Sequence, residues 1–538
     1  MHADRNTVVC LACCGTGLQC RNTEPFDAPP AQPPPVSDEI AQLNTMITQL
    51  LTQRALLLQR ENFQHSSIFK LPSELLAEIF LYADAIDRPI GCSPPKRRHP
   101  LTPIRLGAVC THWRHVAWNS PQLWTQLPLS GCWAWDTKFP LTRVLRTYFQ
   151  NMKATTLELY IDCFRGRFVP DDTDALGDHP PQEGAFNTIF IENADKIRVL
   201  GFKMWPEEWL PHIAKVQETR SFSRLEEIWI KSLGASFDDK LLLANAPRLR
   251  KVEFGGASES ANITLPFSQI THLTLTDVFS DICLNLLVQC TNLEYFYCDE
   301  IGEFSSEGSV VKSTISFPYL KTFHYLDRNV SQTWREALGR HLQFPALESV
   351  IWHPDWSGGV ERQMLRQYPD SLRTLEFLFR RRDQPKMKHM FIPLDSLEEL
   401  RIRCWPAIKL SLLDLLTPQT KKRHQLLPSL RKLLLQARTN EMPTRVTQSL
   451  LAMIRSRRTL TETKLDHLVL SYRVRSYKLA PWPREFIEGI GEFLREGMTI
   501  VIETEGQEMD YDWLQSDTTD SSSRTSFEDI SDEDSRQP

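Results

Sequence analysis

Short apolar segments recur along most of the chain, and each follows the order apolar-x-x-apolar-x-apolar. Between residues 197 and 397 their starting points lie 21 to 28 residues apart. Because alternate side chains of a β-strand face the same side, each segment predicts a short strand with one buried face. The segments are ATTLEL at residue 154, IRVLGF at 197, LEEIWI at 225, LRKVEF at 249, ITHLTL at 270, LEYFYC at 293, LKTFHY at 320, LESVIW at 347, LRTLEF at 372, LEELRI at 397, LRKLLL at 430 and LDHLVL at 465.

This spacing is typical of leucine-rich repeats, whose units are about 20 to 29 residues long and cannot bury their apolar faces alone. Stacked units would form a parallel sheet, with irregular or helical segments such as 238–246 and 446–455 on its outer side. Asparagine is mostly missing from the usual ladder position, so the repeats would be divergent and their number stays open. A β-sandwich is the rival architecture, but its strands recur about every 8 to 12 residues.

Residues 68 to 129 have helical periodicity instead. Pro72 suits a first helical turn, and Leu75, Leu76, Ile79 and Phe80 then recur at the spacing of one helix face. A second helix is predicted where the same pattern returns, at Leu106, Val109, Cys110, Trp113 and Val116. A module of about sixty residues has little core of its own, so a partner would complete part of this apolar surface.

The order Leu-Pro, Glu-Leu-Leu, Ile-Phe, Val-Cys, Trp-Arg and Leu-Trp in this segment resembles an F-box. The resemblance implies docking onto a Skp-type adaptor, and through it onto a cullin. It also extends to F-box proteins of mushroom-forming fungi, which place a leucine-rich helix before the box and a long leucine-rich region after it. The residues that the resemblance assigns to adaptor binding are Leu71, Pro72, Leu75, Leu76, Ile79, Phe80, Val109, Cys110, Trp113, Trp118, Leu123 and Trp124.

The predicted box departs from the family in one place. The insert DAIDRPIGCSPPKRRHPLTP between its helices is longer than the usual turn, and we expect it to be a surface loop. Ahead of the box, residues 37–65 predict an amphipathic helix with Ile40, Leu43, Ile47, Leu50 and Leu57 in a broken heptad. Arg54 and Glu61 interrupt its seam, which leaves docking on the box and a weak dimer as equal alternatives.

Charge differs between the body and the end of the chain. From Glu503 onward there are twelve acidic and two basic residues, a net charge of −10, whereas the whole chain carries −5 and residues 1–502 therefore +5. The end is also poor in large apolar residues, so we expect an acidic, disordered tail. Basic runs elsewhere are dispersed and lack an aromatic or groove-reading context, which favours solvated loops over nucleic-acid binding.

The twelve cysteines are mostly scattered through apolar segments, as expected for buried free thiols in a reducing compartment. Cys10, Cys13, Cys14 and Cys20 are the exception. They have the spacing to bind zinc or be acylated, but without a second pair nearby a disordered tail is the favoured interpretation. We therefore predict no metal site and no cofactor.

Motifs of common enzyme classes are absent: the chain has no P-loop, HExxH, GxSxG or paired CxxC. No run reaches the roughly 18 apolar residues of a membrane span, and the N-terminus is a poor signal peptide. We therefore expect a non-enzymatic, soluble protein of the cytoplasm or nucleus, with no nucleic-acid or membrane partner.

The predicted fold class is α+β, with a small helical F-box module followed by an α/β leucine-rich-repeat-like solenoid. The expected segments are 1–36 disordered, 37–65 helix, 66–130 F-box-like domain, 131–502 solenoid and 503–538 disordered acidic tail. The expected function is a substrate receptor of a Skp-cullin-F-box ubiquitin ligase, and the alternative is a ligase-independent repeat scaffold. Loose candidates for binding an unknown protein target are the large strand residues Trp229, Phe254, Tyr295, Tyr297, His324, Trp352 and Phe377.

Overall fold

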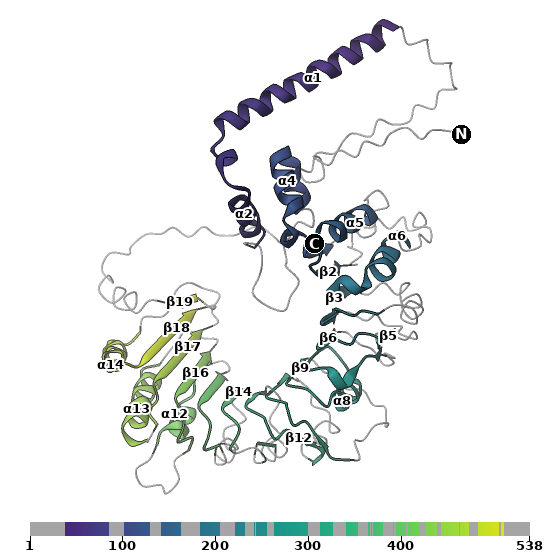
Figure 1. The fold of residues 1–538 in the computed structure, drawn as a ribbon. Coiled ribbons are helices and arrows are strands. Elements are labelled where there is room, and N and C mark those ends of the chain that lie inside the picture. The colour runs from purple at the N-terminus through teal and green to yellow at the C-terminus, as the bar shows by residue number, and fades with distance from the viewer. Residues whose placement is uncertain are drawn as a thin grey trace, which may run out of the picture. The chain divides into compact units, whose positions relative to one another are not determined.

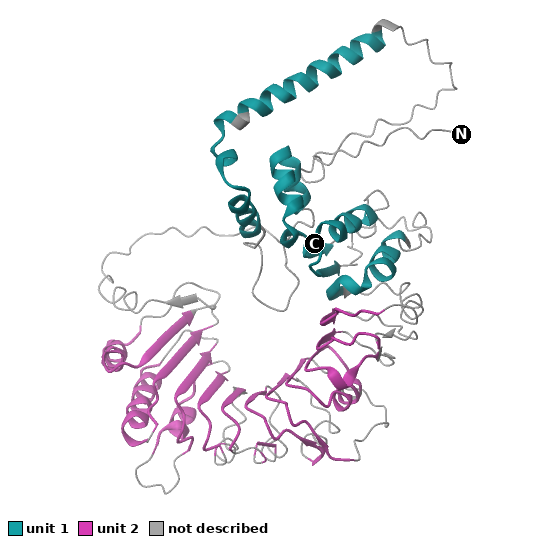
Figure 2. Cartoon of the chain, viewed as in Figure 1, with its two compact units in different colours: residues 1–203 teal, residues 204–538 magenta. Residues whose placement is uncertain are grey.

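The computed structural model of the protein divides into two compact units, residues 1–203 and 204–538 (Figure 2). The sequence placed the main boundary earlier, after residue 130. The structure describes residues 38–85, 102–129, 141–162, 183–204, 221–231, 241–242, 244–255, 263–299, 313–326, 340–352, 364–365, 367, 370–379, 391, 394–404, 407–418, 426–437, 443–461, 463–472, 482–504 and 507–509. The N-terminal cysteines and most of the insert between the predicted F-box helices lie outside these residues.

Unit 1 begins with helices, and its second part alternates strands with helices (Figure 1). Its first helix, over the predicted amphipathic segment, is followed by the helices of the box and by three strands in the order β1-β2-β3. The elements are α1 (Asp38–His65), η1 (Ser67–Lys70), α2 (Ser73–Ala85), α3 (Thr102–Val109), α4 (Thr111–Asn119), η2 (Pro121–Trp124), β1 (Gln126–Leu129), α5 (Leu141–Asn151), β2 (Leu157–Asp162), α6 (Glu183–Phe186), the π-helical turn η5 (Asn187–Glu192), η6 (Ala194–Lys196) and β3 (Ile197–Met204).

The second predicted helix of the box is in fact two helices. Cys110 is extended, with φ −160° and ψ 171°, and its Sγ accepts a hydrogen bond of 3.3 Å from the backbone N–H of Trp113. A side-chain acceptor at this place satisfies one of the free amides at a helix N-terminus. The apolar periodicity of the sequence continues through Cys110, so it did not predict the break between α3 and α4 at this residue.

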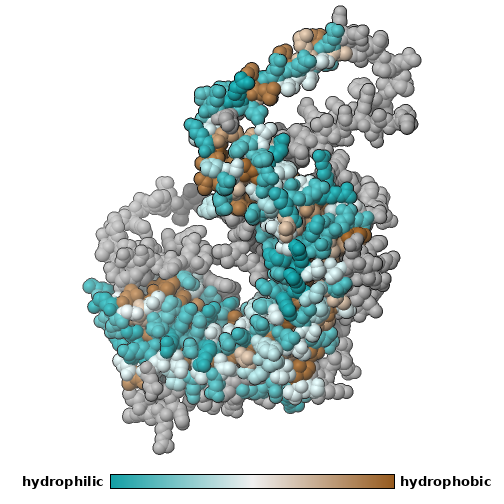
Figure 3. Space-filling model, viewed as in Figure 1, coloured by the Kyte–Doolittle hydropathy of each residue, from teal (hydrophilic) through white to brown (hydrophobic). Residues whose placement is uncertain are grey.

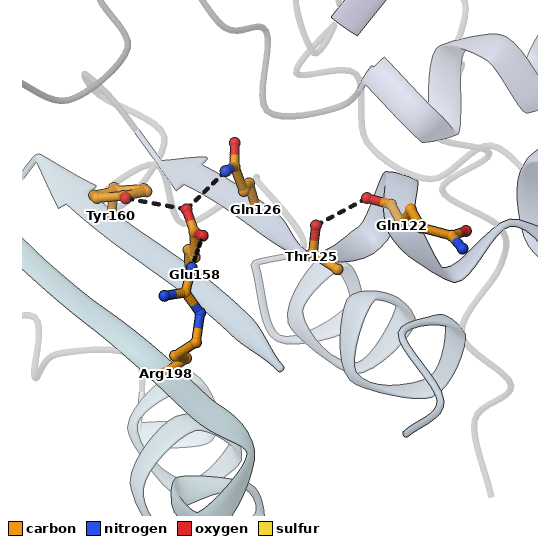
Figure 4. A network of polar contacts seen from close by, with 6 residues as sticks. All are labelled: Gln122, Thr125, Gln126, Glu158, Tyr160 and Arg198. Carbon is orange, nitrogen blue, oxygen red and sulfur yellow. Dashed lines mark hydrogen bonds and ion pairs between the residues drawn. The ribbon is translucent and has the colours of Figure 1, made fainter. Parts of the chain in front are cut away.

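A polar network ties the end of the box to the strands that follow (Figure 4). Glu158 on β2 accepts hydrogen bonds from Gln126 on β1, at 2.7 Å, and from Tyr160, at 3.2 Å, and it forms an ion pair with Arg198 on β3. The Glu158 side chain is only 15% exposed, so a missing partner would be costly. The network therefore fixes the register of three adjacent strands.

Unit 2 is built on one large, mostly parallel sheet. Its strands follow one another in chain order, as the colours from teal to yellow show in Figure 1. The described strands pair in parallel from β4 through β18, and β18 then pairs with β19 in the antiparallel sense. The strands are β4 (Glu227–Ile230), β6 (Lys251–Gly255), β8 (His272–Thr276), β9 (Tyr295–Asp299), β11 (Thr322–Leu326), β13 (Ser349–Trp352), β14 (Thr374–Phe379), β15 (Glu399–Cys404), β16 (Lys432–Ala437), β17 (His467–Tyr472), β18 (Thr499–Thr504) and β19 (Gln507–Met509).

Smaller elements join these strands. Two short parallel pairs are formed by β5 (Leu241–Leu242) with β7 (Ile263–Thr264) and by β10 (Ile315–Ser316) with β12 (Leu342–Gln343). The connecting helices include η8 (Phe267–Gln269), α8 (Ser280–Gln289), α12 (Leu410–Leu416), α13 (Thr444–Leu460) and α14 (Arg484–Arg495). Among the described residues no helix combines the length and the apolarity needed to cross a bilayer.

Burial alternates along the strands of unit 2, as the apolar pattern predicted. On one side, in-register aromatic residues pack across neighbouring strands: the ring centroids of Phe296 and Phe323 are 5.3 Å apart, and those of Tyr325 and Trp352 are 5.2 Å apart. The other side, here called the half-exposed face, contains His272, Thr274, Tyr295, Tyr297, Thr322, His324, Ser349, Ile351, Glu399, Arg401, Lys432 and Leu434.

The residues that lie just before successive strands alternate in charge. Starting with Lys321, whose backbone N–H donates to the carbonyl of Glu294, each of these residues donates to the carbonyl of the corresponding residue on the preceding strand. Arg373 and Glu398 form an ion pair of 3.5 Å in this series. Opposite charges on adjacent strands attract each other, so the series supports the observed register. Its members are Glu294, Lys321, Glu348, Arg373, Glu398, Arg431 and Asp466.

The strand predictions are confirmed, because each of the twelve apolar segments contains a strand. The parallel pairing disagrees with an antiparallel sandwich. Within the predicted segment 238–246, residues Leu241 and Leu242 form a strand, whereas 446–455 lies inside the helix α13. The predicted start of the disordered tail, residue 503, is too early, because β18 runs to Thr504 and β19 follows it. Residues 510–538 lie outside the described part of the chain.

The described cysteines of unit 2 are free thiols in the core: Cys283, Cys290, Cys298 and Cys404 are all buried. Burial raises the pKa of the Cys290 thiol and of the Cys404 thiol to about 12. Neutral thiols of this kind are poor nucleophiles.

Candidate functional site

The helices of the box divide their apolar residues between a core and an exposed face. On α2, Leu76 and Phe80 are 0% and 1% exposed, and the ring of Phe80 lies 4.8 Å from that of Trp113. One residue earlier in each case, Leu75 and Ile79 are 53% and 47% exposed. Side chains four positions apart share a helix face, so α2 has one buried and one exposed apolar face.

Tyr82 extends the exposed face of α2. It lies seven residues after Leu75, on the same side of the helix, and is 71% exposed. We call Leu75, Ile79 and Tyr82 the docking face. Val109, at the end of α3, is also 62% exposed. A run of apolar side chains left in water on a helix that has a separate core face is typical of a protein interaction site.

Tryptophans hold the core beneath this part of the molecule. Trp124 is fully buried, donates from Nε1 to the carbonyl of Ala117 at 2.8 Å, and lies edge-on to Trp118 with ring centroids 5.0 Å apart. Its other edge contact, with Tyr148 on α5, also has a centroid distance of 5.0 Å. A buried indole needs such a partner for its N–H, and this one joins η2 to α4.

The residues predicted to bind an adaptor therefore separate into two groups. Leu76, Phe80, Leu123 and Trp124 are buried and can only support a docking surface from beneath. Leu75, Ile79, Val109 and Pro72 are exposed, and Leu71, Cys110, Trp113 and Trp118 are half-buried. Tyr82 was missed, although its spacing of seven from Leu75 was a visible signal.

The candidate target residues also fall on two faces. Phe254, Trp352 and Phe377 are at most 4% exposed, on the core side of the sheet, because they occupy the last apolar position of the repeat pattern. This differs from the prediction that they lie near one recognition face. Trp229 has the register of the half-exposed face but is only 4% exposed, and Lys231 Nζ lies 5.9 Å from its ring centroid.

Tyr295, Tyr297 and His324 do lie together on the half-exposed face. The rings of Tyr297 and His324 are 4.2 Å apart and meet edge-on, and Tyr295 stacks on His272 at 5.7 Å. Burial, and then the neighbouring Asp299, raise the pKa of the Tyr297 hydroxyl, which donates to Asp299 Oδ2 at 3.3 Å. Burial, and then Lys251, lower the pKa of His272, so neutral imidazole is favoured there.

An ionic network that was not predicted lies further along the same sheet, on β14, β15 and β16. Glu376 pairs with Arg403 at 2.6 Å and with Arg401 at 3.9 Å. Arg401 also pairs with Glu399 at 2.6 Å, and Lys432 reaches Glu399 at 3.3 Å. The carboxylates are 6% and 19% exposed and the cations 36% to 38%, so positive groups lie outermost.

The described residues contain no group of three or more His, Cys, Asp or Glu side chains placed to bind a metal ion. The arrangement instead offers two surfaces for protein contacts, one apolar and one aromatic and charged.

Comparison with known proteins bears on the first surface. No curated protein matches the chain. Residues 68–130 match the model of the F-box-like family. This range contains the docking face and the buried core beneath it. Domains of this type generally bind Skp-type adaptors and so take part in ubiquitin ligase complexes. The helical region at residues 68–130 of this chain is an F-box-like domain.

Proposed function

We propose that the protein is a substrate-receptor subunit of a Skp-cullin-F-box ubiquitin ligase. The F-box-like domain would bind the adaptor, and unit 2 would bind a protein target. The observation that carries this proposal is the exposed apolar face of α2 within the matched range 68–130.

The adaptor step rests on the division of α2 into two faces. Burying an exposed leucine or isoleucine side chain is worth about 1.5 to 3 kcal/mol, so Leu75 and Ile79 together offer enough free energy to matter in binding. The opposite face, with Leu76 and Phe80, is fully used in the core. The docking face is therefore free to serve a partner without any rearrangement of the domain.

The target step rests on unit 2. We infer that its sheet is an array of divergent leucine-rich repeats stacked as a solenoid. Parallel strands recur at repeat spacing, and a single repeat could not bury its apolar side chains without its neighbours. The length and order of this array agree with the resemblance to F-box proteins of mushroom-forming fungi. In this proposal the protein works in the cytoplasm or the nucleus.

Within the array, the favoured recognition residues are Tyr295, Tyr297 and His324. Half-buried aromatic side chains are common binding hot spots because they gain contact area with little loss of conformational freedom. The ionic network further along the same sheet, on β14, β15 and β16, adds outermost cations that can select a partner by its charge. Trp229, Phe254, Trp352 and Phe377 would act through the core that positions these groups.

The mechanism would be one of proximity. A target held by unit 2 and an adaptor held by α2 would raise the local concentration of target lysines near a ubiquitin-conjugating enzyme. In this proposal the chain makes or breaks no covalent bond and needs no cofactor or metal.

Reconstitution tests the proposal. The full chain is mixed with a Skp-type adaptor, a cullin complex and a ubiquitin-conjugating system, and ubiquitin transfer to lysines of the chain itself is measured. We expect transfer that requires the adaptor and is lost with Leu75→Asp/Ile79→Asp. Transfer that is independent of the adaptor, or that persists in this variant, would contradict the proposal.

Target recognition needs a separate test. Proteins near the chain are labelled in cells and compared between the wild type and Tyr297→Ala/His324→Ala, with Tyr319→Ala as control because Tyr319 is 56% exposed and lies outside the strands. The double variant should lose specific neighbours that the control retains. Equal labelling by all three proteins would remove these residues from the recognition surface.

A ligase-independent repeat scaffold is the second candidate function. The family match covers only residues 68–130, whereas most strands of the large sheet lie in unit 2, outside the matched range. If the chain failed to bind any Skp-type adaptor even after removal of residues 1–63, but still captured partners through unit 2, the scaffold would be the better account.

A further inference from the structure

The helix α1 has more exposed large apolar side chains than any other described helix. Large apolar side chains between 48% and 62% exposed occur along its whole length (Figure 3): Ile40, Leu43, Met46, Ile47, Leu50, Leu51, Leu56, Leu57 and Leu58. Helices in proteins owe most of their stability to packing of an apolar face, so α1 needs a partner for this surface.

The apolar residues are not evenly distributed around α1. Ile40, Leu43, Ile47, Leu50 and Leu57 occupy the first and fourth positions of successive heptads, and we call them the seam. The opposite stripe, half a turn away, consists of Thr45, Thr52 and Gln59. The two threonine hydroxyls bond to the carbonyls of Ala41 and Thr48 at 2.8 Å. The seam is therefore apolar, whereas the stripe of Thr45, Thr52 and Gln59 on the opposite side of the helix is polar.

The polar side is the one that meets the F-box-like domain. Gln59 Nε2 donates to the hydroxyl of Thr111, at the start of α4, at 2.6 Å. Because Gln59 lies opposite the seam, this contact turns the seam away from α4. The F-box-like domain is thus poorly placed to cover the seam. Of the two alternatives from the sequence, docking on this domain is disfavoured relative to dimerisation.

The seam is complementary to itself when two copies run in opposite directions. About a midpoint between residues 48 and 49, Ile40 meets Leu57 of the second copy and Ile47 meets its Leu50. Leu43 would meet Arg54, whose aliphatic stem can cover the leucine while the guanidinium reaches water. In the parallel arrangement Arg54 would meet Arg54 and Glu61 would meet Glu61 within the seam, and both pairs repel.

We propose that α1 is a self-association helix that joins two copies of this chain through an antiparallel coiled coil along the seam. A twofold axis across the midpoint makes the same surface serve both copies, as a closed dimer requires. A helix of 28 residues is about 42 Å long, so the antiparallel arrangement places the two F-box-like domains at opposite ends of the pair. This inference is independent of the proposed function.

The first test measures the mass of the purified full chain by sedimentation equilibrium over a wide range of protein concentrations. The monomer mass is 62.3 kDa, and we expect the mass to rise to twice this value with concentration. The seam variant Ile47→Asp/Leu50→Asp should stay monomeric. The control Thr45→Asp/Thr52→Asp adds the same charges to the opposite stripe and should still dimerise. Adaptor binding by both variants should equal that of the wild type.

The second test determines orientation by mixing the wild type with Arg54→Glu and measuring the fraction of mixed dimer. In the antiparallel pair each residue 54 faces Leu43, so we expect the statistical fraction. A clear excess of mixed dimer would indicate a parallel coiled coil. A wild type that is monomeric at every concentration, or a dimer that survives the seam variant, would overturn the proposal; capture of a different protein by the seam of such a monomer would assign the helix to that partner instead.

Discussion

Gly107 on α3 lies against the indole ring of Trp118 on α4. A Cβ atom at residue 107 would be 2.7 Å from Cη2 of Trp118 and closer still to Cζ3. The neighbouring backbone is held as well, because the carbonyl of Gly107 accepts a hydrogen bond of 2.8 Å from Arg114 Nε. The two helices of the F-box-like domain therefore approach closely only because residue 107 has no side chain.

Replacing Gly107 by alanine should destabilise the domain. Alanine would gain about 0.8 to 1 kcal/mol of helix propensity, but forcing a methyl group into a packed site typically costs about 1 to 3 kcal/mol, and here the neighbour is a rigid ring. The midpoint of denaturant unfolding, followed by tryptophan fluorescence, should fall for Gly107→Ala. It should hardly change for Ala108→Ser, the exposed neighbour; a rise for Gly107→Ala would mean that the helices separate easily.

The sulfur cap of α4 gives a second prediction. Cys110 Sγ accepts from the Trp113 N–H at 3.3 Å, and a serine hydroxyl is a better acceptor at the same place. Cys110→Ala should lose about 0.5 to 1 kcal/mol of unfolding free energy, whereas Cys110→Ser should remain close to the wild type. If alanine proved at least as stable as serine, the contact would be packing and not a cap.

Arg457 on α13 is a buried cation without a carboxylate partner among the described residues. It is 1% exposed and donates to the carbonyls of Leu416, Leu427 and Leu426 at 2.8, 3.0 and 3.1 Å. Burial lowers its pKa to about 10, so it is charged at neutral pH. Arg457→Met should cost about 3 kcal/mol or more, because buried carbonyls lose their donors.

The control for this prediction lies two residues away. Arg455 pairs with Glu492 at 3.1 Å, and the two side chains are 56% and 52% exposed. Exposed pairs contribute about 0 to 1 kcal/mol, so Arg455→Met should have a small effect on thermal unfolding. Equal losses for the two variants would show that the Arg457 bonds are not specific.

The apolar pattern of the sequence was sufficient to predict where the strands lie. The same pattern also indicated the burial of Phe254 and Trp352, because both occupy its last apolar position and so face the core. The helix break at Cys110 could not be foreseen, because cysteine is not a usual cap and the apolar periodicity passes through it. Glu376 and Arg403 are brought together only by the pairing of β14 with β15, which depends on the length of the loop between them.

Glu253 gives a prediction on pH. Burial raises the pKa of its carboxyl above the usual value, Lys231 opposes this shift and Glu227 adds to it. In the pH range between the unfolded and the folded pKa, the folded state binds more protons, so stability falls as pH rises through that range. Glu253→Gln should therefore unfold at a higher temperature than the wild type at neutral pH, and the difference should shrink in acid.

The central claim is that the exposed face of α2 docks an adaptor. Its most direct test is titration calorimetry of the full chain with a purified Skp-type adaptor, for the wild type, for Leu75→Asp/Ile79→Asp and for the control Tyr319→Asp. Because both substituted α2 residues are about half exposed, the domain should fold unchanged, as fluorescence of its buried tryptophans would verify.

We predict binding by the wild type and the control, and an affinity at least about 100-fold lower for the α2 variant, equivalent to about 2.7 kcal/mol. Equal binding by all three proteins would place the adaptor elsewhere on the chain. No binding by a folded wild type would contradict the claim.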